Sequence, residues 1–188
     1  MKEDWEKLPI FKKAREICDL VEHLVKAVEN TDIEFENPIE SEMIQHNLTY
    51  LRNNAMIIPA KIAGVAKDDT FYDMRMENAA IIRKAARELI TDARGLEMHG
   101  YKDKEYLDLL RDQVDEFRVL FAEWVKTFDP WNYVIDRWGL FNPPGVNYDD
   151  HDPDDDLPFD ADDRFDDDLF DDDLFDDDIF DNDIFDDD

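Results

Sequence analysis

The sequence predicts an all-α fold: an antiparallel four-helix bundle followed by a disordered acidic C-terminal tail. Between residues 5 and 128, apolar residues recur at alternating steps of three and four, the period of a helix buried on one side. No segment there alternates apolar and polar residues as a strand would. From residue 149 onward aspartate dominates, and a block of like charge stays solvated. We therefore expect a bundle over 5–128, an aromatic-rich junction packed on it over 129–148, and a disordered tail over 149–188.

Each of the first two predicted helices carries one apolar stripe. The first helix covers about residues 9–29 and tolerates Pro9 in its opening turn, where a backbone N–H lacks a helical partner. Its stripe is Ile10, Ala14, Ile17, Val21, Leu24 and Val28. After the interruption TDIEFENP, the second stripe is Ile44, Leu48, Leu51, Ala55, Ile58, Ile62 and Val65. Pro59 lies inside this second helix, so we expect a kink there.

The third and fourth helices are bounded by capping residues. Thr70 followed by Asp73 has the spacing of a capping box, Gly100 is suited to a helix stop, and Asp103 can cap the next helix. The third stripe is Ile82, Ala85, Ala86, Leu89, Ala93 and Leu96. The fourth is Leu107, Leu110, Val114, Phe117, Phe121, Trp124 and Phe128, ending at the Asp129–Pro130 pair. Four long stripes joined by short turns specify an antiparallel bundle with shallow crossing angles.

Charge is distributed unevenly along the chain. Residues 149–188 contain 23 Asp and one basic residue, Arg164, a net charge of −22 out of −30 for the whole sequence. The first 148 residues carry 28 acidic and 20 basic residues, a net charge of −8. Binding to a phosphate backbone needs clustered Lys and Arg, so direct nucleic-acid binding is not expected. The balance favours a basic partner.

No motif for catalysis, a cofactor or a metal is recognisable. A dimetal bundle needs Glu-x-x-His pairs, but His23, His46 and His99 all lack a glutamate three positions earlier. No nucleophile triad or phosphate-binding glycine loop occurs, and we predict a non-enzymatic protein. Cys18, the single cysteine, is interpreted as a small packing residue and fits a reducing compartment. With no signal-peptide pattern and no membrane-length apolar run, a cytoplasmic location is expected.

The junction concentrates aromatic residues in a short span. Trp131, Tyr133, Trp138 and Phe141 would be unfavourable to expose in a solvated linker. One interpretation is a short helix after Pro130 that folds back over one end of the bundle. The other is a clasp that these four residues form on a neighbouring protomer or a partner.

The tail repeats a unit of three Asp, one Leu or Ile, and one Phe. The five-residue period fits neither a helix nor a strand, so we interpret the units as separate recognition elements. Each unit suits a shallow apolar pocket ringed by Lys or Arg on a protein partner, and several copies raise the local concentration. The predicted partner-binding residues are Leu157, Phe159, Phe165, Leu169, Phe170, Leu174, Phe175, Ile179, Phe180, Ile184 and Phe185.

Three segments of the predicted bundle resemble a known family. They are LPIFKKAREI at 8–17, IIPAKIAGVA at 57–66 and ENAAIIRKAAREL at 77–89. They are similar to the four-helix-bundle proteins encoded in 23S ribosomal RNA intervening sequences, and the similarity covers about residues 5–128. Relatives in that family include the pentameric accessory protein of diversity-generating retroelements. The resemblance implies a homo-oligomer, a pentamer by analogy, with an accessory role. It does not carry over nucleic-acid binding, because those relatives are basic.

A second resemblance lies in the tail, where DPDDDLPFD at 152–160 is similar to the acidic tip of bacterial single-stranded DNA-binding proteins. Here Phe159 is internal, whereas that family's tip ends the chain. The leading hypothesis is an oligomeric adaptor that recruits protein partners through the tail. One alternative is a tail that mimics nucleic acid or autoinhibits by occupying a basic surface. Another is a bundle that acts as an accessory factor of a nucleic-acid enzyme.

Overall fold

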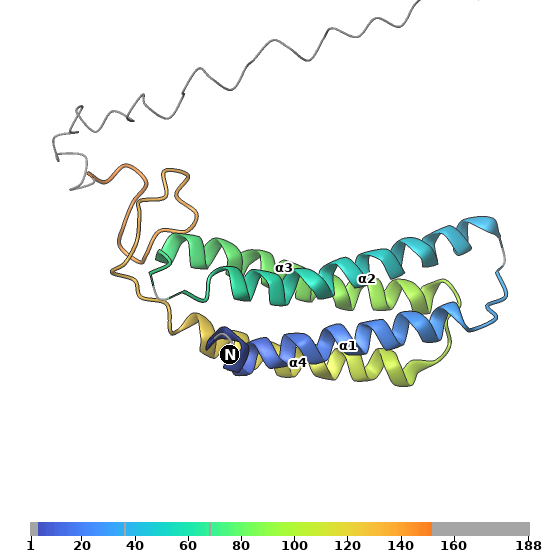
Figure 1. Cartoon of the computed structure of the whole chain (residues 1–188). Coiled ribbons are helices and arrows are strands. Elements are labelled where there is room, and N and C mark those ends of the chain that lie inside the picture. The colour runs from blue at the N-terminus through green and yellow to red at the C-terminus, as the bar shows by residue number, and fades with distance from the viewer. Residues whose placement is uncertain (1–3, 36, 68, 152–188) are drawn as a thin grey trace, which may run out of the picture. The chain divides into compact units, whose positions relative to one another are not determined.

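The computed structural model describes residues 4–35, 37–67 and 69–151, and over these residues the fold is all-α. A short 3-10 helix, η1 (Asp4–Lys7), precedes four α-helices. They are α1 (Pro9–Glu29), α2 (Pro38–Gly64), α3 (Tyr72–Met98) and α4 (Lys104–Val125) (Figure 1). The predicted disordered tail, apart from residues 149–151, and all eleven predicted partner-binding residues lie outside the described residues.

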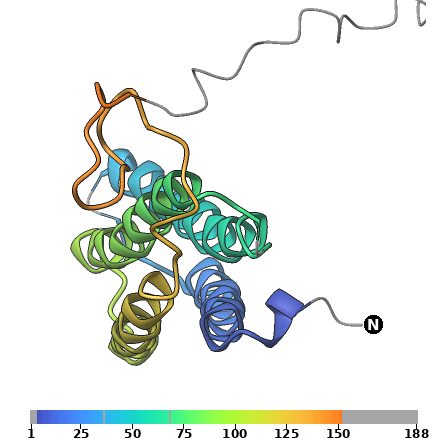
Figure 2. The ribbon, with the colours of Figure 1, turned by 90° about the vertical axis from the view of Figure 1, so that its left-hand side faces the viewer.

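The helices form an antiparallel bundle in which each helix contacts two neighbours. α1 packs against α2 and α4, and α3 packs against the same two helices, so the four enclose one core (Figure 2). All predicted stripe residues of α1, α2 and α3 are buried, as are those of the fourth stripe except the half-buried Phe121. None of the helices in the described part combines the length and apolar composition that a membrane span requires.

Two of the predicted helix ends are confirmed, and one is wrong. Asp103 caps α4 by accepting from the Glu105 N–H at 3.1 Å, and Gly100 follows α3 with a φ of 100°. The Thr70–Asp73 capping box does not form, because Phe71 is the N-cap and no side chain caps α3. The carboxylate of Asp73 instead accepts from the N–H of Val134 in the junction at 3.1 Å.

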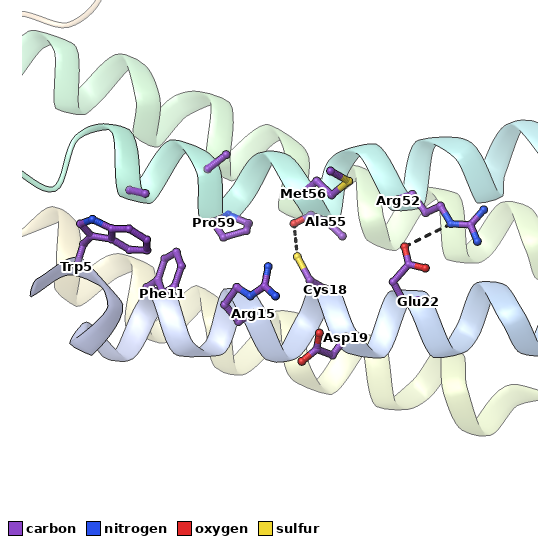
Figure 3. A pocket seen from close by; sticks show the side chains of 12 residues that line it. Trp5, Phe11, Arg15, Cys18, Asp19, Glu22, Arg52, Ala55, Met56 and Pro59 are labelled. Carbon is purple, nitrogen blue, oxygen red and sulfur yellow. Dashed lines mark hydrogen bonds and ion pairs between the residues drawn. The ribbon is translucent and has the colours of Figure 1, made fainter. Parts of the chain in front are cut away.

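α2 continues through Pro59 without a break, and Cys18 provides a replacement for the lost hydrogen bond. Proline has no N–H, so the carbonyl of Ala55, four residues earlier, loses its helical donor. The Cys18 thiol on α1 donates to this carbonyl at 2.8 Å (Figure 3). Cys18 is therefore both a packing residue, as predicted, and a donor to an unsatisfied carbonyl.

The contact between α2 and α3 is close and partly polar. A Cβ at Gly95 would lie 2.4 Å from the amide nitrogen of Asn47, so glycine permits the approach of the two helices. One turn earlier on α3, Asp92 accepts from the buried Asn54 amide at 3.2 Å. Burial raises the pKa of Asp92 to about 6, a shift that the Asn54 hydrogen bond opposes and the nearby Glu88 charge increases.

Candidate functional site

The junction, residues 129–150 in the structure, is built of turns and contains no helix. The predicted short helix after Pro130 is therefore wrong. Several backbone N–H groups of the junction bond to nearby carboxylates, not to carbonyls four residues earlier. For example, the Trp131 N–H donates to Asp129 at 3.0 Å. Local side-chain acceptors of this kind compete with helix formation.

The junction is attached to the start of α3 by hydrogen bonds from both sides. The Tyr72 N–H donates to the Asn132 carbonyl at 2.7 Å, and the Val134 N–H donates to Asp73. Ile135, the next residue, is buried. These contacts place the junction with the bundle in one compact unit that ends at Asp150.

Asp136 organises the loop of residues 136–142, which we name the Asp136 loop. Its carboxylate accepts from three backbone N–H groups, those of Trp138 at 2.9 Å, Leu140 at 2.8 Å and Phe141 at 2.9 Å. These bonds favour the charged form and lower the pKa of Asp136. The Asn142 side chain accepts from the Asp136 N–H and donates to its carbonyl, which closes the loop.

A second set of bonds fixes the end of the junction. The Arg137 guanidinium donates to the carbonyls of Tyr148 at 3.1 Å and Asp150 at 2.8 Å. The Asn147 N–H donates to the Asp150 carboxylate at 2.7 Å and thereby lowers the pKa of that group. The hydrogen-bonded junction thus runs to Asp150, two residues beyond the predicted boundary.

The four predicted clasp residues divide into two pairs. Trp131 and Trp138 are 88% and 90% exposed, whereas Tyr133 and Phe141 are half-buried. Leu140, which the sequence did not single out, is 75% exposed beside Trp138. Exposed tryptophan side chains on an ordered loop form an apolar surface of the kind found in protein interfaces.

Two shallow grooves lie beside these exposed side chains. Trp131 and Tyr133 border one of about 370 Å³, together with Tyr72 and Phe128 of the bundle. Trp138 borders another of about 540 Å³, whose other lining residues include Leu140, Phe141, Asp73 and Glu77. The exposed tryptophans therefore stand next to hollows that a partner side chain could fill.

A groove of about 420 Å³ between α1 and α2 is the second surface of interest (Figure 3). Trp5 and Phe11, whose rings meet edge to face at 4.6 Å, form one end of the groove, and the exposed Met56 lies further along it, near Cys18 (Figure 3). Cys18 lies in its wall, and burial raises the pKa of that thiol. Because the thiol is held protonated as a donor to Ala55, it is poorly suited to act as a nucleophile.

The sequence contained a partial indication of the Asp136 loop. Asp136 and Gly139 lie three positions apart, and Asp and Gly are both typical turn residues, because Asp bonds its own backbone and Gly permits a positive φ. Gly139 adopts a φ of 72°, which an L side chain rarely tolerates. Which aromatic residues would face solvent could not be inferred, because the junction has no regular period.

The residues offer no metal centre: within the described part of the chain no three His, Cys, Asp or Glu side chains are grouped to hold an ion. Comparison of the chain with protein-family models, with curated proteins and with solved structures finds no match. The resemblance to the 23S intervening-sequence bundle family therefore stays a prediction.

Proposed function

We propose that this protein is a non-enzymatic adaptor whose junction and tail together bind a protein partner. The observation that supports this most is the exposure of Trp131 and Trp138 in a hydrogen-bonded junction, where Asp129 accepts from the Trp131 N–H and Asp136 from the Trp138 N–H. A loop fixed before binding loses little conformational entropy when a partner arrives. Tryptophan is among the side chains that contribute most to interface affinity.

The chemistry of the tail specifies the partner. Residues 152–188 contain 21 Asp and one Arg, and Phe recurs every five positions from Phe165 to Phe185. A basic surface with apolar pockets would attract the charge at long range and bind the Phe side chains at contact. Since each unit would bind weakly, affinity would come from several units on one chain.

We further propose that the bundle self-associates through the outward face of α2. This helix carries only four charged residues, Glu40, Glu42, Arg52 and Lys61, and its exposed side chains include Met43, Tyr50 and Ile57 at intervals of seven. Two copies of a chain with net charge −30 could meet most easily over such a face. The family resemblance implies a pentamer. Native mass spectrometry tests whether this face is the contact, by comparing the oligomeric state of the native chain with that of the Tyr50→Glu/Ile57→Glu variant.

We place the adaptor in the cytoplasm. Cys18 is the one cysteine of the chain, and its thiol is buried and used as a hydrogen-bond donor. A reducing compartment keeps such a thiol intact.

The test of tail recruitment is affinity capture followed by mass spectrometry. The native chain is compared with a full-length variant in which Phe165, Phe170, Phe175, Phe180 and Phe185 are replaced by Ala, which leaves the net charge unchanged. A third chain stops after His151, so that the Arg137 and Asp150 bonds of the junction are retained. We expect partner recovery to fall at least about tenfold in both variants, since several anchors are lost together. Equal recovery from all three chains would reject recruitment by the tail.

A further inference from the structure

Three arginines on the outer side of α3 have guanidinium groups without a partner among the described residues. Arg83, Arg87 and Arg94 are separated by four and seven positions, spacings that return to the same side of a helix, and all three are exposed. In the part of the chain that the structure describes, no other group bonds to their guanidinium groups. By contrast, Arg52 pairs with Glu29 at 3.2 Å. We name this row the arginine face.

The acidic residues of α3 that follow Arg87 in the sequence already have partners. Glu88 pairs with Lys84 at 3.6 Å, and Asp92 accepts from the Asn54 amide at 3.2 Å. Glu97 pairs with Arg111. The face is therefore a concentration of positive charge that the described part of an acidic protein leaves unmatched.

We propose that the arginine face binds the Asp-rich segment of this same chain, residues 152–188. The segment has a net charge of −20, from 21 Asp and Arg164. Carboxylates bind guanidinium groups through paired, charge-assisted hydrogen bonds, which is the interaction that Arg favours over Lys. The inference rests on the proposed function, because the Asp/Phe units that bind the partner also bind the arginine face. The bundle then competes with the partner for the same units.

The dimensions of one tail unit match those of the arginine face. Arg83 and Arg94 are eleven residues apart on α3, which corresponds to about 16 Å along the helix. Two successive Phe residues of the tail, such as Phe165 and Phe170, are five residues apart and span about 16 Å when extended. The three Asp residues between them span about 7 Å, close to the rise of about 6 Å from Arg83 to Arg87. The first Asp of the next unit lies about 10 Å further along the extended chain, as Arg94 does from Arg87.

Apolar side chains are available on α3 for the Phe residues of the tail. Ile90, between Arg87 and Arg94 in the sequence, is half-buried, and Met98, one turn beyond Arg94, is 80% exposed. Methionine sulfur makes favourable contacts with aromatic rings. The face thus combines the two features that each tail unit requires, a cluster of positive charge and adjacent apolar contacts.

The length of the segment permits this contact within one molecule. The 37 residues of 152–188 reach about 120 Å when extended, whereas α3 with its 27 residues is about 40 Å long. The segment follows directly after a junction that is bonded to the first turn of α3. Covalent attachment raises the effective concentration of the units to the millimolar range, so weak contacts are populated.

Paramagnetic relaxation enhancement on the full chain tests the proposal without any partner. A spin label is attached at Asn182→Cys, and the amide signals of α3 are recorded at low salt and at 1 M salt, where the Debye length is about 3 Å. We expect broadening centred on residues 83–94 at low salt and its reduction by at least about threefold in 1 M salt. The chain without this substitution, treated with the same label, controls for reaction at the buried Cys18.

Two charge-matched variants decide the assignment. Arg83→Glu/Arg87→Glu/Arg94→Glu should abolish the broadening, whereas Lys12→Glu/Lys26→Glu/Lys67→Glu, exposed on other segments, should leave it. Broadening spread evenly over the bundle, or unchanged in the arginine variant, would overturn the proposal. The proposal would also be overturned if a single-stranded oligonucleotide bound these arginines without reducing the broadening caused by the tail. The face would then be assigned to phosphate groups. This measurement contains no partner, so its result is independent of the capture experiment. Tail recruitment can fail in the capture experiment while the contact with α3 persists, and the contact can be absent while recruitment succeeds.

Discussion

The bundle and the junction are stabilised by different interactions, and they expose different surfaces. The bundle buries its apolar stripes in one core, as at Leu89, and turns charged side chains outward. The junction is held by backbone hydrogen bonds to Asp136 and Asp73, and it turns Trp131 and Trp138 outward. Packing alone accounts for the first arrangement. The second keeps large apolar side chains in water, which folding does not require, and this observation supports the proposed binding role.

The largest expected effect is a difference in the free energy of unfolding between a substitution in the bundle and one in the junction. Leu89→Ala removes a fully buried side chain of α3, and we expect it to lower the free energy of unfolding by about 2–5 kcal/mol. Trp138→Ala should change it by no more than about 0.5 kcal/mol, because the ring is exposed. Chemical denaturation measures both values. A large loss in Trp138→Ala would show that the junction stabilises the fold and would remove the argument for binding.

Asp92 gives the bundle a dependence on pH. Its pKa of about 6 lies above the ordinary value of 3.8, so the folded state holds this proton more tightly than the unfolded state does. Stability from this group is present below about pH 4 and is lost as pH rises through about 6. Asp92→Asn should therefore raise the free energy of unfolding by about 1–2 kcal/mol at pH 8 and by little at pH 4.5, after allowance for partial exposure. An equal change at both pH values would contradict this account.

Gly95 tests how close α2 and α3 lie. In an exposed helix Gly→Ala stabilises by about 1 kcal/mol, but here the new Cβ would meet the Asn47 amide. We expect Gly95→Ala to lower the free energy of unfolding by about 1 kcal/mol, since the half-buried Asn47 side chain must leave its place between the two helices. In an Asn47→Ala background the sign should reverse. A stabilising effect of Gly95→Ala alone would show that the Asn47 side chain moves aside freely.

Asp136 produces the smallest expected change in global stability and a clear local one. Asp136→Ala should speed hydrogen exchange at the amides of Trp138, Leu140 and Phe141 and leave α3 unchanged. Asp129→Ala, which removes one bond to Trp131, is the matched control. Because the Asp136 pKa is lowered, the loop should stay ordered above pH 4 and open as pH falls through that lowered value. Unchanged exchange in Asp136→Ala would mean that other contacts hold the loop.

The sequence predicted the bundle well because helical period and burial are coupled. The stripes from Ile10 to Val28 and from Ile82 to Leu96 are buried as expected, and α1 has the predicted bounds. The predicted capping box at the start of α3 was wrong because Asp73 bonds to Val134, 61 positions away, and a local sequence pattern cannot show such a contact. The fourth helix ends at Val125, although Phe128 beyond it is still buried.

The candidate site was only partly accessible from the sequence. Aromatic density indicated the junction, but the hydrogen bonds of Asp136 decide that Trp138 faces solvent and Phe141 does not. The arginine face was missed for another reason. The first 148 residues carry 28 acidic and 20 basic residues, and a net charge of −8 does not reveal the local row of Arg83, Arg87 and Arg94.

The most direct test of binding by the junction is partner capture by the chain with Trp131→Ala and Trp138→Ala, with the free energy of unfolding measured in parallel. We expect recovery to fall at least about tenfold at unchanged stability, as loss of two anchor residues implies. Leu109→Ala/Val119→Ala, which removes exposed apolar side chains from α4, should keep native recovery. Native recovery by the double tryptophan variant would contradict the account.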